Sequence, residues 1–394
     1  MPPAKHILPI IVIAQFCCTS LWFAGNAVMD NLVNDFSLSS DVLAHLTSAV
    51  QFGFITGTLV FAVLTLADRF SPSKVFFYSA LAGALFNLGT IFPSNTLATL
   101  ISWRFMTGFC LAGIYPVGMK IAADYFQKGL GKSLGFLVGA LVLGTAFPHL
   151  LKAFATDLPW KSVLIATSLL AVTGGGLILL FVPDGPFRKA VQKPDFTAIF
   201  KVFQNRNFRA AAFGYFGHMW ELYAFWAFVP IMLMNKMDED IINFNVSILS
   251  FFIIGLGSLS CVFGGYVSLW FGVKKTAFTA LLLSGFCCML SPVAFHVFNE
   301  NLFIAFLIFW GLVVIMDSPL FSTLVAQNAV AENKGTALTI VNCIGFSITI
   351  ISIQWVSYLL ENWGMIDAFV VLAIGPILGL IAFISNRKKM VGDW

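Results

Sequence analysis

The sequence has few charged side chains, since only 10% of its 394 residues are Asp, Glu, Lys or Arg. An ordinary soluble domain carries roughly 25%, so the composition excludes that class of protein. There is no polar low-complexity tract, and 15% of the residues are aromatic, which excludes a disordered or nucleic-acid-binding chain. Hydrophobic residues instead make up 59% of the sequence. This composition indicates an integral membrane protein.

The sequence also lacks the patterns of common cofactor and metal sites. Its seven cysteines all fall in apolar stretches without CxxC or Cys/His spacing, so we expect buried thiols, no metal site and no cofactor. No Walker A motif is present, so ATP is not the expected energy source. A membrane-embedded transferase or protease would need a cluster of acid, base or metal-ligating residues. We find no such constellation and do not expect an enzyme.

Twelve segments are long and apolar enough to cross a bilayer as helices, for which about 20 residues are needed. We therefore predict an all-α polytopic membrane protein with twelve transmembrane helices. The first segment follows a single Lys and resembles a signal peptide, but no small-x-small cleavage site follows it, so we expect it to be retained. The segments are residues 8–32, 44–66, 75–93, 98–122, 133–154, 162–182, 210–234, 245–269, 276–297, 302–326, 336–359 and 366–386.

The basic residues are distributed unevenly over the two sides of this arrangement. Of the 22 Lys and Arg residues, 17 fall on the side of the termini, three fall on the opposite side, and Arg104 and Lys120 lie within the fourth span. Cytoplasmic loops are rich in Lys and Arg, so the bias places both termini in the cytoplasm. We expect a multi-pass protein of the plasma membrane, in a bacterium the inner membrane.

The longest polar segment, Pro183–Arg209, carries six basic residues and separates six spans from six. Aligning the two halves matches Gly108 and Pro116 with Gly311 and Pro319. Two six-helix repeats of parallel orientation are typical of transporters whose substrate lies between the halves. The predicted domains are an N-terminal bundle (1–183), a basic cytoplasmic linker (184–209) and a C-terminal bundle (210–394).

Two local motifs resemble signatures of the major facilitator superfamily. The run LTLADRFSPSK is similar to its cytoplasmic loop signature, with Asp68, Arg69 and Lys74 in matching positions and two of its glycines replaced. In the fourth span, Arg104 and Gly108 match a second signature. The resemblance covers essentially the whole chain. It implies that the loop charges hold one conformation, that spans 1, 4, 7 and 10 line a cavity, and that transport proceeds by alternating access.

Three titratable residues are candidates for proton coupling. Ionisable groups near the bilayer centre are costly and mark functional sites. Glu221 lies near the middle of the seventh span, His218 is one helical turn earlier, and Asp317 lies near the middle of the tenth. We predict that Glu221 loads and releases the proton and that His218 relays it. The alternatives are a buried hydrogen-bond network around Glu221 and, for Asp317, a role at a proline kink.

Arg104 is a candidate anion ligand, because a guanidinium presents paired donors to a carboxylate. The alternatives for it are a salt bridge between helices and the local structural role that its family signature permits. Polar and aromatic residues on the same spans are further candidates for the cavity wall, although such stripes also serve helix packing. They are Trp22, Asn26, Tyr115, Trp220, Tyr223, Trp226, Trp310 and Asn342.

The function predicted from these residues is secondary active transport of a small polar solute, with a small organic or inorganic anion as one candidate, coupled to protons by symport or antiport. In the resembled family, nitrate and nitrite porters bind their anion between arginines of spans 2 and 8. These spans contain no Arg here, which disfavours such a porter. Proton-driven efflux of lipophilic or cationic compounds is the alternative, and a transporter-like receptor would need a long soluble extension. The expected partners are the solute, protons and membrane lipids, with no nucleic acid, and we expect a monomer.

Overall fold

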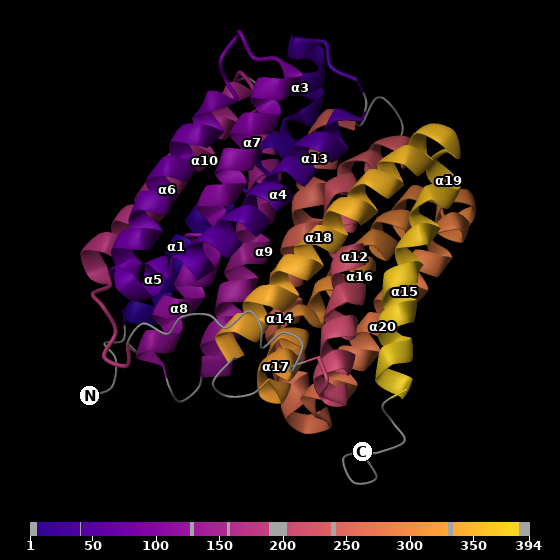
Figure 1. Cartoon of the computed structure of the whole chain (residues 1–394). Coiled ribbons are helices and arrows are strands. Elements are labelled where there is room, and N and C mark those ends of the chain that lie inside the picture. The colour runs from indigo at the N-terminus through magenta and orange to yellow at the C-terminus, as the bar shows by residue number, and fades with distance from the viewer. Residues whose placement is uncertain are drawn as a thin grey trace. The chain divides into compact units, whose positions relative to one another are not determined.

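The structure is a computed structural model that describes residues 6–39, 41–126, 130–155, 158–188, 203–237, 242–329 and 334–385. Regular structure in these ranges is helical, as predicted (Figure 1). The chain divides into two compact units. Unit 1 comprises Met1–Lys193 and Met237–Ser258, and unit 2 comprises Pro194–Lys236 and Leu259–Trp394. Most of the predicted basic linker, residues 189–202, lies outside the described residues.

Unit 1 is a bundle in which α10 packs against α1 and α6, α4 packs against α7, and α9 packs against α1 and α13. Figure 1 shows α1, α6 and α10 side by side. The helices of unit 1 are α1 (Ile7–Thr19), α2 (Ala24–Ala27), α3 (Met29–Phe36), α4 (Val42–Val63), α5 (Leu66–Arg69), α6 (Pro72–Gly89), α7 (Leu97–Leu111), α8 (Tyr115–Tyr125), α9 (Leu130–Phe154), α10 (Lys161–Phe181) and α13 (Ile242–Gly255).

Unit 2 is built around one long helix, α12, which packs against α16, α17, α18 and α20. Helix α15 packs against α16, α17 and α20 and so completes the bundle on another side. The helices of unit 2 are α12 (Arg206–Lys236), α14 (Gly257–Phe271), α15 (Val273–Val297), α16 (Glu300–Met316), α17 (Ser318–Asn328), α18 (Lys334–Asn362), α19 (Met365–Ala368), the 3₁₀ helix η3 (Phe369–Ala373) and α20 (Ile374–Ser385).

Each of the twelve predicted spans coincides with helix in the structure. Within the described ranges, eight helices or joined helix pairs are long and apolar enough to cross a membrane, and two shorter apolar helices, Ile7–Thr19 and Phe369–Ser385, occupy the first and last spans. Helices α6 and α12 coincide with the two remaining spans. The sequence therefore located the spans correctly, to within a few residues at their ends.

Several spans that the sequence predicted as single helices are broken. The fourth is split into α7 and α8, and the tenth into α16 and α17; both second segments have Pro in their first turn. Proline lacks the N–H that would continue the helix. The eighth is split at Leu256, which lies between two glycines. The first is split between Thr19 and Ala24 without any proline, so its free backbone groups need another partner.

Close helix contacts in unit 1 depend on glycine. A Cβ at Gly108 of α7 would overlap the carbonyl oxygen of Val50, and one at Gly53 of α4 would overlap the carbonyl oxygen of Phe105. The two backbones therefore touch, as small residues permit between membrane helices. By contrast, a Cβ at Gly135 of α9 would meet nothing within 4 Å.

We expect Gly108→Ala to destabilise the protein by forcing α4 and α7 apart, at a cost of about 1 to 3 kcal/mol for an overpacked core. Gly135→Ala should be neutral or slightly stabilising, because alanine is the better helix former. Thermal unfolding of the detergent-solubilised variants measures both. Equal melting temperatures for the two variants would contradict the close contact.

Candidate functional site

The Glu221 carboxyl group is buried in the core of unit 2, with 0% of the residue exposed. Helix α12 carries it to a position between α15 and α16. The indole N–H of Trp310 donates to Oε1 at 2.6 Å, and the hydroxyl of Ser284 donates to Oε2 at 2.9 Å. Within the described parts of the chain, no basic side chain lies within ion-pair distance of it. Neutral donors alone therefore hold this carboxyl group.

One turn earlier on α12, the imidazole of His218 faces Asp317. The distance from His218 Nδ1 to Asp317 Oδ1 is 2.8 Å, and both side chains are buried. The two groups are not aligned for a hydrogen bond, and among the described residues His218 Nε2 and Asp317 Oδ2 have no hydrogen-bond partner. Although Asp317 precedes α17, its side chain does not cap that helix. The Asp317 carboxyl group thus faces His218 and does not cap the helix that follows the kink.

Aromatic rings enclose these polar groups. The ring centroids of Trp310 and Phe225 are 4.6 Å apart, and those of Trp310 and Phe306 are 5.5 Å apart. The His218 ring lies 6.3 Å from that of Phe321. Rings of low polarity lower the local dielectric, which strengthens electrostatic interactions inside the cluster. We call Glu221, His218, Asp317, Trp310 and Ser284 the carboxyl cluster.

The other aromatic candidates of unit 2 lie elsewhere in the bundle. Tyr223 and Trp226 are buried and in ring contact at 5.3 Å, and Tyr223 also contacts Phe346 of α18. Trp220 is half-buried and donates to the backbone oxygen of Val371 at 3.1 Å. Asn342 is half-buried on α18. Of the predicted residues in unit 2, the structure therefore brings together Glu221, His218, Asp317 and Trp310.

In unit 1, Arg104 caps the broken first span. Its guanidinium is fully buried and donates to the backbone oxygens of Leu21, at 3.2 Å, and Trp22, and to Oδ1 of Asn87 at 3.3 Å. Asn87 in turn donates to Ser168 of α10 at 3.0 Å. These bonds satisfy the carbonyls that the break between α1 and α2 leaves free. The placement favours a structural role over that of an anion ligand, and Arg104 has no ion pair in the described chain.

The remaining candidates of unit 1 lie near the same break. Asn26 of α2 donates to the hydroxyl of Thr47 at 2.8 Å, and the ring of Trp22 lies 4.9 Å from that of Phe54, both partners being on α4. Tyr115 is half-buried at the start of α8. Trp22 and Asn26 therefore both contact α4.

Comparison with known proteins agrees with this architecture. The profile of the Major Facilitator Superfamily matches residues 11–353. The chain belongs to the major facilitator superfamily. No curated protein sequence matches it significantly.

Two solved structures share the fold. A bacterial homolog of the human lysosomal transporter Spinster, in an inward-facing and unoccupied conformation, has a TM-score of 0.74 at 12% identity over 99% of both chains. The nucleoside transporter NupG, in the form of a point mutant, has a TM-score of 0.73 at 15% identity over 98% of this chain and 100% of its own. The predicted resemblance and fold class are thereby confirmed, and the protein is a membrane transporter and not an enzyme.

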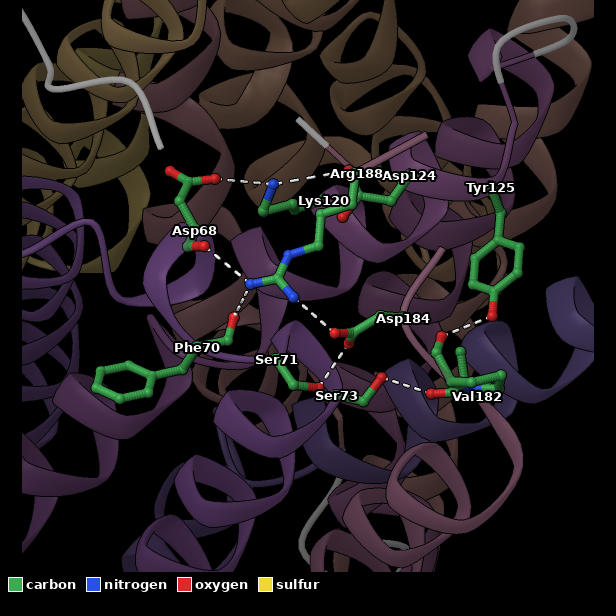
Figure 2. Close-up of polar contacts among 11 residues, drawn as sticks. Asp68, Phe70, Ser71, Ser73, Lys120, Asp124, Tyr125, Val182, Asp184 and Arg188 are labelled. Carbon is green, nitrogen blue, oxygen red and sulfur yellow. Dashed lines mark hydrogen bonds and ion pairs between the residues drawn. The ribbon is translucent and has the colours of Figure 1, made fainter. Parts of the chain in front are cut away.

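The superfamily's loop signature forms a charged cluster in unit 1 (Figure 2). Lys120 of α8 lies 2.9 Å from Asp68 and 3.6 Å from Asp124, one helical turn later on α8. The other two signature residues, Arg69 and Lys74, are exposed. Of the three predicted loop residues, only Asp68 has an ion pair in the described chain.

Sequence reasoning missed the residue that holds this loop in place, Arg188. It was counted with the basic linker, but its guanidinium pairs with Asp184 at 2.6 Å and donates to the backbone oxygens of Asp68 and Phe70 at 2.8 and 2.7 Å (Figure 2). Asp184 also accepts from Ser71 at 2.6 Å. The segment after α10 is therefore packed onto the signature loop. No charge pattern signals this, because the main acceptors are backbone atoms.

We expect Arg188→Ala to lower the free energy of unfolding by about 1 to 3 kcal/mol, because two backbone oxygens and one carboxylate lose their donor. Arg69→Ala is the matched control: it removes an exposed guanidinium of the same cluster region and should change stability little. Thermal or denaturant unfolding of the solubilised protein measures the difference. Losses of equal size would show that Arg188 does not hold the loop.

Proposed function

We propose that this transporter couples the movement of a small polar solute to protons by alternating access, with Glu221 as the proton-carrying group. The setting of Glu221 supports this most directly: its carboxyl group is fully buried, accepts two hydrogen bonds from neutral donors, and has no cation beside it in the described residues. Its charge is therefore not compensated locally. A change of solvent access during transport would change which protonation state is favoured.

The pair of His218 and Asp317 supports the same role. It places a second titratable carboxylate and an imidazole one helical turn from Glu221, and Asp317 is near enough to act electrostatically on Glu221. Removing the Glu221 charge by protonation lowers the repulsion between the two acids. We propose that His218 and Asp317 stay paired while Glu221 changes its charge, and that His218 is the group through which protons exchange.

The proposed class of solute depends on whether a buried basic side chain is free to bind an anion. Since both terminal nitrogens of Arg104 donate to protein oxygens, we propose that it does not bind an anion. A neutral polar solute is the preferred candidate. The nucleoside transporter of similar fold brings nucleosides into the set of solutes to be tested, without showing that this chain carries them.

Proton-driven efflux of a lipophilic cation is the second candidate. The observation that favours it is the group of rings around Glu221, since Trp310, Phe225 and Phe306 would contact an aromatic or alkyl cation that approached the carboxylate. Aromatic faces attract cations, and the attraction grows when water is excluded.

We further propose that the protein is a monomer in a bacterial inner membrane with both termini in the cytoplasm. The distribution of basic residues, 17 on the side of the termini against three opposite, supports this orientation. It places the loop cluster of Asp68, Lys120 and Arg188 at the cytoplasmic surface.

We expect Glu221→Gln to abolish solute accumulation driven by a pH gradient, because the amide cannot take up a proton at this position. Exchange of labelled for unlabelled solute at equal pH should persist, since that reaction needs no net proton movement. Proteoliposomes with an imposed gradient measure both, with uridine, a hexose, acetate and tetraphenylphosphonium as probes.

Glu361→Gln provides the matched control, because Glu361 is an exposed carboxylate at the end of α18 in the same unit. It should accumulate solute as the unmodified protein does. Undiminished gradient-driven accumulation by Glu221→Gln, with any of the four probes, would refute the coupling role of Glu221.

For the ion pair, we expect Asp317→Asn and His218→Gln each to destabilise unit 2, by about 3 to 5 kcal/mol where a charged partner is left buried and alone. The double variant should lose much less than the sum of the two, because no unpaired charge remains. A double-mutant cycle from unfolding of the solubilised protein tests this. Additive losses would mean that the two side chains are not electrostatically coupled.

A further inference from the structure

The Ser284 hydroxyl lies within hydrogen-bond distance of two acceptors. Its Oγ is 2.9 Å from Oε2 of Glu221 and 3.2 Å from the backbone oxygen of Leu281, one turn earlier on α15. A hydroxyl group carries a single hydrogen, so Ser284 donates to only one of these oxygens at a time. Its oxygen can also accept a hydrogen bond. Ser284 therefore has two alternative hydrogen-bond arrangements at unchanged heavy-atom positions.

The opposite side of the carboxyl group has no such freedom. The indole of Trp310 is a donor only, so Oε1 of Glu221 must accept in every state. A proton on Oε1 would compete with the Trp310 N–H for the same oxygen. A proton that binds Glu221 is therefore directed to Oε2, the oxygen that faces Ser284.

From this geometry we propose that Ser284 is the positioning residue for the transported proton, acting as a hydroxyl switch beside Glu221. When the carboxylate is charged, Ser284 donates to Oε2. When a proton relayed by His218 binds Oε2, the new O–H donates to Ser284 Oγ, and the hydroxyl hydrogen turns to the backbone oxygen of Leu281. Within Glu221 and Ser284, only the O–H bond of the carboxyl group forms or breaks. This inference rests on the proposed function of Glu221.

The switch leaves neither the Glu221 carboxyl group nor the Ser284 hydroxyl unsatisfied in either state. A buried donor or acceptor without a partner is unfavourable. Ser284 gives the carboxyl group a hydrogen-bond partner both before and after protonation, without movement of a helix. The other titratable groups near Glu221 are the Cys288 thiol, which lies against the carboxyl group, Cys287 on the same helix, and the pair of Asp317 and His218. Of these, Cys288 alone is placed to compete with Ser284.

Ser291 provides the matched control on the same helix. It is fully buried, and its hydroxyl donates to the backbone oxygen of Cys288 at 2.8 Å, with no side-chain acceptor beside it in the described structure. Ser284→Ala and Ser291→Ala therefore remove the same atoms from the same helix, but only the first removes a partner of Glu221.

Infrared difference spectra of the purified protein, recorded across a pH titration without solute, report the C=O stretch of a protonated carboxylic acid. We expect a band that Glu221→Gln removes. In Ser284→Ala the band should move to higher frequency, because the acid O–H has lost its acceptor. Ser284→Thr should restore its position, and Ser291→Ala should leave it unchanged.

Transport provides the second readout. A hydrogen bond to a charged group contributes about 1.5 kcal/mol or more, so gradient-driven accumulation of whichever probe the unmodified protein carries should fall about tenfold in Ser284→Ala. Exchange at equal pH should change little. A lower melting temperature in both Ser284→Ala and Ser291→Ala would show a loss of packing common to the two variants. The position of the carboxylic acid band would still distinguish one variant from the other.

The outcomes distinguish this inference from the proposed function. If Glu221→Gln keeps the band and full accumulation, the coupling role of Glu221 fails and Ser284 has no proton to position. If Glu221→Gln removes both but Ser284→Ala keeps the band where it was, the switch is overturned and the coupling role stands. A band that moves in Cys288→Ala, and not in Ser284→Ala, would assign the acceptor to the thiol and overturn the role of Ser284.

Discussion

The hydrocarbon layer offers no hydrogen bonds, so a membrane protein has to satisfy every buried polar group with its own atoms. This constraint is visible at the breaks of the first, fourth and tenth spans. At the start of α8 and α17, proline occupies the first turn and removes an N–H that would have no acceptor. At the break in the first span, between Thr19 and Ala24, no proline is present, and Arg104 donates to the carbonyls of Leu21 and Trp22 instead. A costly buried cation is kept there because the backbone at the break requires donors.

The same constraint shapes the carboxyl cluster. A buried carboxylate could be satisfied by a basic residue, but a permanent cation would fix its charge. Here the partners are an indole and a hydroxyl, which solvate the charge without compensating it. The nearby imidazole of His218 is directed to Asp317 and not to Glu221. Because of this division, Asp317 has a basic partner and Glu221 has none in the described residues, although both carboxyl groups lie in the same low-dielectric core.

Sequence reasoning reached the parts of this arrangement that depend on composition and periodicity. The spans followed from hydropathy, and His218, Glu221 and Asp317 stood out because ionisable residues are rare among apolar ones. The breaks before Tyr115 and Ser318 coincide with Pro116 and Pro319, although both spans were predicted as single helices. The pair of His218 and Asp317 was not predicted, since it joins helices far apart in the chain and depends on how they rotate against each other.

The backbone contacts of three other residues were not predicted, for a common reason. Arg104, Arg188 and Ser284 all act through backbone oxygens, and every residue supplies one, so their partners leave no mark in the sequence. Arg188 was hidden further by its neighbours, because a basic cluster after a span is typical of topology rather than of a specific contact. Ser284 looks like any small residue in a packed helix. Which backbone oxygen accepts from a given side chain is known only once the fold shows which donor lies beside it.

The charge balance of unit 2 links the two candidate functions. With Glu221 protonated, the buried core holds only the pair of His218 and Asp317; with Glu221 ionised, it carries an additional negative charge that the described residues do not neutralise. Moving an uncompensated charge through a low-dielectric region is unfavourable, so the loaded and empty carriers favour reorientation only when Glu221 is neutral or has gained a cation. Under the proposed coupling role, a lipophilic cation that binds Glu221 would replace the proton, which is antiport. A neutral solute would be coupled by symport only where the empty carrier also returns with Glu221 ionised. The charge of the solute and the return of the empty carrier together thus decide the mode of coupling in this proposal.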